Sequence, residues 1–478
     1  MLLSQRTGYD ASHPHSPGAI LGIFKATDLS ASGPIVAVRP SSLVPSSPQL
    51  QRVIGPWGVA ANAINSAVGG GIFVLPGLVA AVLGPSAILA YLLCGAAIAL
   101  VLTCFAEMGS VVHRSGGCVA YVEEAFGPLA GFLAWAAYSV GFEITADAAL
   151  GALLIDAAAT VVPPLSHGLP RVFALFAVFA TLAVVNFRGV KESIKLSVVT
   201  TTAKLVPLVL LILGGVFFMH RSNFHWTGAP SFRELDNGAF LIFFAYQGIE
   251  ESLAPSAEIR EPRRTVPLAI FYATAGLILL YAAIQLVAQG ILGADLGRSL
   301  TTPLADAGGR IAGSGGRSLL LIGASISVFG SIVVGMICTP RVFFLMAQNG
   351  ILPASLARVH PRFQTPHNSI FAVTAITFLL SATGAFRHLA ALSVSSILLV
   401  YLAICIGALR LRYTRPLQQG AFRARGGPTV AILGAAVVLW LLASTTRSDL
   451  ALLGGMLALA TVYSFLARRL NSRKKLSP

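Results

Sequence analysis

The sequence predicts an all-α integral membrane protein with twelve transmembrane helices, and three observations support this fold class. First, 55% of the 478 residues are hydrophobic and only 11% are charged, whereas soluble domains carry roughly 25% charged residues. Second, apolar runs of about 18 residues or more, the length that spans a bilayer, recur along the chain. Third, lysine and arginine residues gather on one side of these runs.

The apolar runs give the expected helices in chain order, and the fourth and eleventh runs are the shortest. They cover Val53–Leu83, Ser86–Glu107, Phe126–Val162, Val172–Asn186, Leu196–Phe218, Ala239–Pro255, Val266–Leu292, Leu319–Met346, Ser369–Thr383, Leu389–Leu409, Val430–Ala443 and Leu450–Leu466.

The chain divides into one helical domain and two tails. Residues 1–50 are rich in Ser and Pro, and no basic segment in them precedes a long apolar stretch. We therefore expect a disordered cytoplasmic extension rather than a signal peptide. Residues 51–468 form the twelve-helix domain, and residues 469–478 form a basic cytoplasmic tail.

The distribution of charge predicts that both termini are cytoplasmic. With the N-terminus inside, the outer loops hold few of the 33 lysine and arginine residues: Arg171, Arg221, Arg233, Arg298, Arg310, Arg317, Arg387 and Arg447. The others lie inside, apart from Lys204 within a helix, as the positive-inside rule requires. Because the basic residues are spread over many short loops, we expect no nucleic-acid partner.

The motifs give no sign of an enzyme. The five cysteines lack the spacing of metal ligands. Signatures of metalloproteases, hydrolases and phosphate-binding loops are absent. We therefore expect no covalent chemistry, no metal and no cofactor.

Three glycines interrupt the first apolar run, in the stretch INSAVGGGIFVLPG from Ile64 to Gly77. Each costs about 1 kcal/mol of helix propensity relative to alanine. A broken helix persists in hydrocarbon only where it lines a protein-enclosed site. Its freed N–H groups and the positive end of a half-helix suit a carboxylate. The alternative is a close contact between helices, for which small residues are typical.

A second break interrupts the sixth run, in FFAYQGIEESLAP from Phe243 to Pro255. Gly248 and Pro255 flank Glu250 and Glu251. The first and sixth runs occupy matching places in two five-helix halves. Paired breaks in such places indicate the binding site of a secondary transporter.

These stretches resemble motifs of the amino acid–polyamine–organocation permeases. VGGGIFVLPG is similar to that family's Gly-Ser-Gly-Ile-Phe signature, with Gly70 where Ser, Thr or Ala is common. The sixth-run motif continues into the family's Glu-x-x-x-Pro-x-Arg loop through Glu258, Pro262 and Arg264. The segments AEMGSVVHRSGGCVAYVEEAFGPLAGF and TPRVFFLMAQNGILPASLARVHPRFQTP resemble those after the second and eighth helices. The resemblance implies a LeuT-type fold, in which two inverted five-helix repeats are followed by two extra helices.

The resemblance also implies a substrate site at the two breaks. The substrate carboxylate would meet N–H groups of the first break, and its amine would meet carbonyls of the second. The residues expected at this site are Gly69, Gly70, Gly71, Ile72, Phe244, Ala245, Tyr246, Gln247 and Gly248. Tyr246 and Phe244 either face the substrate or pack as ordinary aromatics.

Charged residues inside the apolar runs need partners. Glu143 and Asp147 lie four positions apart on the third helix and so share a face. They either bind a cationic side chain of the substrate, relay protons or accept hydrogen bonds from neighbouring hydroxyl groups. Glu250 either binds protons, contacts substrate or locks the half-helix. Glu107 ends the second helix, where we expect it to pair with a basic residue.

Lys204 lies nearly half-way into the fifth helix, a costly place for a cation. Several proton-coupled relatives carry a lysine there, in place of the sodium ion of other transporters with this fold. The resemblance thus implies that Lys204 takes part in proton coupling, with carbonyls near Ala67 and Val68 and the hydroxyl of Ser325 or Ser327 as partners. The alternative is a structural lysine whose stem snorkels to the interface.

The sequence therefore predicts a proton-coupled amino acid permease that works by alternating access in the plasma membrane, the inner membrane of a bacterium. One alternative is a permease or exchanger for cationic amino acids or polyamines, which Glu143, Asp147 and Glu250 would favour. An alternative of another class is a nutrient sensor with the same fold and no flux, because fold does not fix function.

Overall fold

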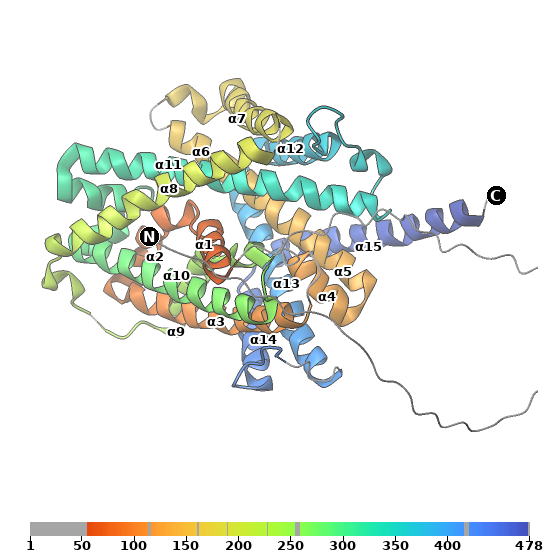
Figure 1. Ribbon diagram of the computed structural model, residues 1–478. Coiled ribbons are helices and arrows are strands. Elements are labelled where there is room, and N and C mark those ends of the chain that lie inside the picture. Colours follow the sequence, from red (N-terminus) through yellow and green to blue (C-terminus); the bar gives the residue numbers. More distant parts are fainter. Residues whose placement is uncertain are drawn as a thin grey trace, which may run out of the picture. The chain divides into compact units, whose positions relative to one another are not determined.

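The computed structural model describes residues 55–112, 116–159, 162–188, 190–226, 228–253, 259–414 and 420–476. Within these ranges it leaves the side chains of 190–198, 386–387 and 467–476 undescribed. The expected N-terminal tail, Pro255 and the motif residue Glu258 lie outside the described residues. The described chain is helical almost throughout (Figure 1).

Every predicted apolar run forms helix. The longer helices are α1 Pro56–Ala67, α2 Gly71–Leu83, α3 Ala87–Val111, α4 Gly117–Phe126, α5 Pro128–Trp135, α6 Thr145–Ala159, α7 Gly168–Arg188, α8 Val190–Gly215, α9 Phe232–Phe243, α10 Pro262–Leu292, α11 Pro303–Gln348, α12 His367–Ala382, α13 Phe386–Thr414, α14 Pro428–Ala443 and α15 Arg447–Leu476. The π-helical segment η2, Ala136–Ile144, joins α5 to α6.

Seven helical stretches of the described chain are long and apolar enough to cross a membrane. They are Gly71–Val111, Gly168–Arg188, Val199–Phe218, Pro262–Arg298, Pro303–Gln348, His388–Thr414 and Arg447–Leu466. Two further apolar helices, α12 and α14, are shorter. Other predicted runs are interrupted within their length, so the expected total of twelve spans stays a prediction.

Both predicted breaks are present. The first run divides into α1 and α2, with Val68, Gly69 and Gly70 between them. The sixth run divides into α9 with the 3-10 turn η6, Phe244–Tyr246, and the 3-10 turn η7, Ile249–Leu253. Between these turns Gly248 has φ +97°, and a Cβ there would lie 3.1 Å from the Ser66 carbonyl oxygen. Glycine thus permits both the backbone conformation and the close approach of the two breaks.

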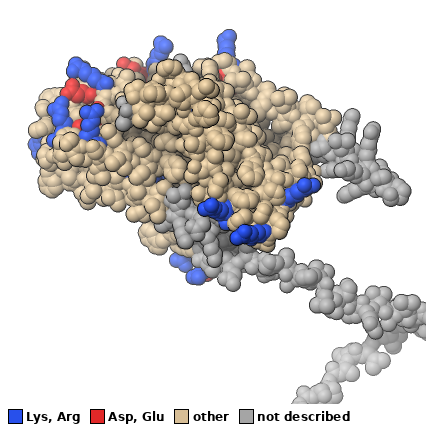
Figure 2. All heavy atoms as spheres, turned by 90° about the horizontal axis from the view of Figure 1, so that it is seen from above, with Lys and Arg blue, Asp and Glu red and all other residues tan. Residues whose placement is uncertain are grey.

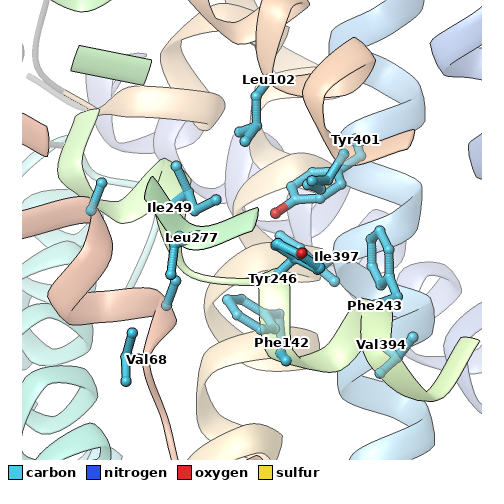
Figure 3. Close-up of a cluster of buried hydrophobic side chains, with 14 of the residues drawn as sticks. Val68, Leu102, Phe142, Phe243, Tyr246, Ile249, Leu277, Val394, Ile397 and Tyr401 are labelled. Carbon is cyan, nitrogen blue, oxygen red and sulfur yellow. The ribbon is translucent and has the colours of Figure 1, made fainter. Parts of the chain in front are cut away.

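The long helices pack in pairs. Figure 1 shows α8 beside α11 and α3 beside α10, and both pairs are in contact. The broken segments lie within the hydrophobic core. Figure 3 shows Val68 from the first break and Ile249 from the second break near Leu277 of α10, and Tyr246 and Tyr401 belong to the same buried cluster.

Charged side chains are scarce on the face shown in Figure 2, where the lysine, arginine and acidic residues lie mostly near the margins. Large apolar side chains are exposed on several helices, as Phe217, Phe173 and Leu459 show. This surface is the one expected of a chain surrounded by lipid, and it follows from the low charge content of the sequence.

Candidate functional site

A small cavity of about 80 Å³ lies where the two breaks meet. Its walls come from the first break, from η2 and α6, from the second break and from α11. The lining residues are Asn65, Ser66, Ala67, Gly69, Gly70, Gly71, Phe142, Glu143, Ala146, Asp147, Leu150, Phe244, Ala245, Gln247, Gly248, Glu251, Ser331, Val334 and Gly335. The cavity therefore gathers most of the predicted site residues from elements far apart in the sequence.

The first break presents backbone donors. Gly69 N–H donates to the Ala67 carbonyl at 2.8 Å, and Phe73 N–H donates to the Gly70 carbonyl at 3.2 Å. Gly70 caps α2 without a side-chain hydrogen bond. In the described structure this leaves the N–H groups of Gly70, Gly71 and Ile72 without a partner, as the first turn of a helix generally does. Of the donors expected from the sequence, Gly69, Gly70, Gly71 and Ile72, only Gly69 uses its N–H group within the first break.

The three glycines have different neighbours. A Cβ on Gly69 would lie 3.2 Å from the Ser331 hydroxyl, and one on Gly71 would lie 3.2 Å from the Phe244 ring. A Cβ on Gly70 would overlap the side chain of Val328 on α11. Gly70 therefore serves a close helix contact as well as lining the cavity, so the helix-contact alternative holds at this position and carboxylate binding stays a prediction.

Glu143 and Asp147 both line the cavity, as their shared helix face predicted. Glu143 Oε2 accepts a hydrogen bond of 2.8 Å from the Thr339 hydroxyl. Asp147 lies against Gly335, where a Cβ would overlap its carboxylate. Glu143 belongs to the π-helical segment, which the sequence did not predict and which is a frequent feature of functional sites.

The two glutamates of the second break point in different directions. Glu250 is 2% exposed and accepts hydrogen bonds from the Tyr401 hydroxyl at 2.7 Å and from Gly248 N–H at 3.2 Å. Only Glu251 lines the cavity. The sequence singled out Glu250 as the functional member, but its observed contacts fit the alternative in which it locks the half-helix. Adjacent residues of a 3-10 turn diverge by about 120°, which explains the difference.

Lys204 of α8 is 1% exposed and donates a 2.7 Å hydrogen bond to the Asn65 carbonyl. The partner is therefore one turn earlier than the expected Ala67 and Val68 carbonyls. Asn65 also accepts a 2.6 Å hydrogen bond from Thr201 through its side chain. Lys204 interacts electrostatically with Glu251 as well. The lysine thus holds the residue just before the first break against α8 and carries its charge near Glu251.

Of the aromatic residues, Phe244 lines the cavity and Tyr246 does not. Tyr246 is fully buried, and its hydroxyl lies 3.4 Å from the Tyr91 carbonyl. The Tyr281 hydroxyl of α10 lies 2.9 Å from the Ala67 carbonyl and 2.8 Å from the Ala245 carbonyl. It bridges the two breaks and occupies a carbonyl that was expected to face the substrate amine.

Away from the cavity, Glu107 pairs with Arg412 through two hydrogen bonds of 2.9 and 2.5 Å. This confirms that Glu107 pairs with a basic residue. Asn65, Glu251 and Tyr281 are the neighbours that the sequence prediction missed. Glu251 could have been found as the second acid of the motif, whereas Tyr281 has no distinguishing pattern in the sequence.

Known proteins with similar sequences are transporters. The sequence profile described as amino acid permease matches residues 54–453. The methylthioribose transporter of Bacillus subtilis (strain 168) is 28% identical over 83% of this chain and 89% of its own length. The serine/threonine exchanger SteT of the same strain is 28% identical over 88% of this chain and 98% of its length. The branched-chain amino acid permease BcaP of Lactococcus lactis subsp. cremoris (strain MG1363) is 25% identical over 78% of this chain and 85% of its own length.

The profile covers most of the chain, from just before α1 to the beginning of α15. Its members are multi-pass membrane transporters and not enzymes. Together with the two broken helices that meet at one cavity, this shows that the chain belongs to the amino acid permease family, within the amino acid–polyamine–organocation family.

Proposed function

We propose that this protein transports amino acids by alternating access and binds them in the cavity between the two breaks. One observation carries the proposal: a single cavity is bordered by both interrupted helices and by three carboxylates, those of Glu143, Asp147 and Glu251. The substrate carboxylate accepts hydrogen bonds from the N–H groups of Gly70, Gly71 and Ile72. The positive end of the α2 dipole favours this anion.

The substrate amine lies toward the second break. Phe244, Ala245, Gln247, Gly248 and Glu251 border the cavity there. The Ala245 carbonyl already accepts from Tyr281, so we assign the amine to the remaining oxygen atoms of this break and to Glu251. A hydrogen bond in which the donor or the acceptor is ionised is roughly twice as strong as one between neutral groups.

The wider architecture follows the family. We propose twelve spans, of which the first ten form two inverted LeuT-type repeats, within residues 51–468. The tails 1–50 and 469–478 face the cytoplasm, and the protein lies in the plasma membrane. The support is the position of the two breaks and the charge of the loops.

Transport is coupled to protons in this proposal. Lys204 holds the Asn65 carbonyl just before the first break and interacts with Glu251 beside the cavity. A proton that moves between these groups would change how firmly the two breaks are held together. Glu250 contributes by fixing the second break to Tyr401.

A second candidate is a permease for amino acids with a second amino group. The three carboxylates favour it, since no lysine or arginine is among the described residues that line the cavity. A substrate with one amine would leave two of the carboxylates without a cationic partner. An ammonium side chain would satisfy Glu143 and Asp147, which face the cavity from η2 and α6.

Counterflow of labelled substrate into proteoliposomes tests these functions. The panel contains serine, leucine, arginine, lysine, putrescine and methylthioribose as internal substrates. Exchange of any amino acid supports the proposed function, and preference for arginine or lysine supports the second candidate. Binding without exchange would instead identify a sensor. Exchange of methylthioribose alone would contradict the carboxylate site, because this sugar has no carboxylate.

A further inference from the structure

A second cavity, of about 970 Å³, lies between α3, α10 and the segment after α13. We call it the α3–α10 groove. It shares no lining residue with the candidate transport site. Three arginines border it, Arg263 and Arg264 from the first turn of α10 and Arg425 from the segment before α14. Leu268, Phe271 and Ile278 of α10 form part of its apolar wall.

The groove has the length of one membrane leaflet. Ile278 follows Arg264 by fourteen positions on α10, which corresponds to about 21 Å along the helix. Half of a bilayer with its headgroups is roughly 20–22 Å thick. The arginines therefore lie at headgroup level when Ile278 lies near the middle of the bilayer. Because α10 belongs to a predicted span, the apolar part of the groove faces hydrocarbon rather than water.

The chemistry of the groove changes along its length. Guanidinium groups match phosphate oxygen atoms in a forked geometry, and the described residues that line the groove include no aspartate or glutamate. Deeper in, the Phe271 side chain is 66% exposed and offers apolar contact. The Thr274 hydroxyl is buried and has no hydrogen-bond partner in the described structure. The ligand must therefore carry an anionic group at one end and a long apolar group at the other.

We propose that the α3–α10 groove binds one anionic phospholipid. Its phosphate lies among Arg263, Arg264 and Arg425, and an acyl chain runs along α10 toward Ile278. A basic pocket between transmembrane helices is a recognised kind of lipid headgroup site. The predicted orientation places this lipid in the cytoplasmic leaflet.

Thermal unfolding of the full chain in detergent micelles tests the proposal. Phosphatidylglycerol is titrated into the purified protein, and phosphatidylcholine and soluble glycerol phosphate are titrated separately. We expect phosphatidylglycerol to raise the midpoint of unfolding, since a ligand of the folded state stabilises it. The double variant R264Q/R425Q should raise the half-saturating lipid concentration about tenfold or more. Arg233→Gln, an exposed arginine outside the groove, is the matched control and should leave it unchanged.

A second variant keeps the test decisive if the double variant does not unfold cooperatively. Ala275→Trp fills the apolar part of the groove and should also raise the half-saturating concentration about tenfold. Equal stabilisation by phosphatidylcholine would overturn the proposal, because the arginines would then select nothing. Equal stabilisation by glycerol phosphate would reveal a simple phosphate site, and an unchanged titration in Ala275→Trp would exclude the acyl-chain position. Either result rejects the lipid site.

Discussion

The two helix breaks meet at one cavity but supply different chemistry. The first break, between α1 and α2, has no charged side chain from Ile64 to Gly77 and offers bare backbone donors. The second, around η6 and η7, is followed in η7 by Glu250 and Glu251, which point in different directions. In the proposed mode of binding, the first break therefore meets the anionic end of the substrate and the second break meets the cationic end.

The difference teaches how a zwitterion can be held in an apolar setting. Each end of the substrate meets the opposite kind of group, and the low dielectric of the interior strengthens both interactions. Tyr281 connects the breaks through the Ala67 and Ala245 carbonyls, and Lys204 bonds the Asn65 carbonyl just before the first break. Variants at these connections and at each break test whether the division holds.

The largest effect is expected at Lys204, which bonds the Asn65 carbonyl just before the first break and carries its charge near Glu251. Lys204→Gln should abolish accumulation of substrate driven by a pH gradient, because glutamine cannot exchange a proton. Exchange without a gradient should persist in the same proteoliposomes and serves as the internal control. Wild-type uptake should not require sodium and should rise as the external pH falls. A glutamine variant that still accumulates substrate would remove Lys204 from the coupling mechanism.

The two glutamates give the sharpest internal comparison. Glu251→Gln should lower substrate exchange roughly a hundredfold, the effect of losing a charged partner in a buried site. Glu250→Gln should mainly lower the free energy of unfolding, by about 1–3 kcal/mol, since its carboxylate bonds to Tyr401 and Gly248. Exchange rates and thermal unfolding are measured on both variants. If Glu250→Gln reduced exchange more than Glu251→Gln, the roles assigned to the two glutamates would have to be reversed.

Substitutions of the glycines in the first break should separate effects on stability from effects on substrate binding. Gly70→Ala should destabilise the protein by about 1–3 kcal/mol, because the new methyl group overlaps Val328. The double variant Gly70→Ala with Val328→Ala should recover part of this loss. Gly69→Ala meets only the Ser331 hydroxyl at 3.2 Å and should spare stability while it weakens substrate binding about tenfold. Stability unaffected by Gly70→Ala would disprove the close contact with α11.

Tyr281→Phe removes the hydroxyl that joins the breaks. We expect a loss of about 1 kcal/mol in unfolding free energy, the net value of one such hydrogen bond. The exchange rate should change as well, because the Ala245 carbonyl becomes available to the substrate amine. Tyr246→Phe is a suitable comparison, since its hydroxyl makes only a 3.4 Å contact outside the cavity. Identical behaviour of the two variants would argue against a bridging role.

The smallest effect is expected at the outer ends of the two broken helices. Gly55 caps α1 without a side-chain bond, whereas Ser231 and Glu234 form a capping box at α9. Ser231→Ala should cost about 1 kcal/mol. Hydrogen bonds from the Ser231 side chain and backbone lower the pKa of Glu234. The ionised carboxylate therefore stabilises the cap above its unfolded pKa of about 4.3, and this contribution is lost as the pH falls through the lower folded value. As the pH falls, the difference in unfolding midpoint between wild type and Ser231→Ala should therefore shrink. An unfolding difference that stays constant from pH 7 to pH 3 would contradict this account.

The sequence by itself determined where helices form and where two of them break. Apolar length locates the helices, and Gly69 to Gly71 and Gly248 mark the breaks, because these features depend on local residues alone. The shared face of Glu143 and Asp147 and the basic partner of Glu107 followed in the same way from periodicity and charge. The π-helical turn at Glu143 was not predictable, because it depends on packing rather than on a sequence signal.

Only the tertiary structure decided which groups reach the cavity. The sequence places Glu250 and Glu251 side by side, but the 3-10 turn sends one toward Tyr401 and the other into the cavity. Val328 next to Gly70 and Tyr281 between the breaks come from helices more than two hundred residues beyond the first break. The physical reason is that helix propensity and hydropathy act along the chain, whereas the direction of a side chain and the partner it meets depend on how distant helices pack.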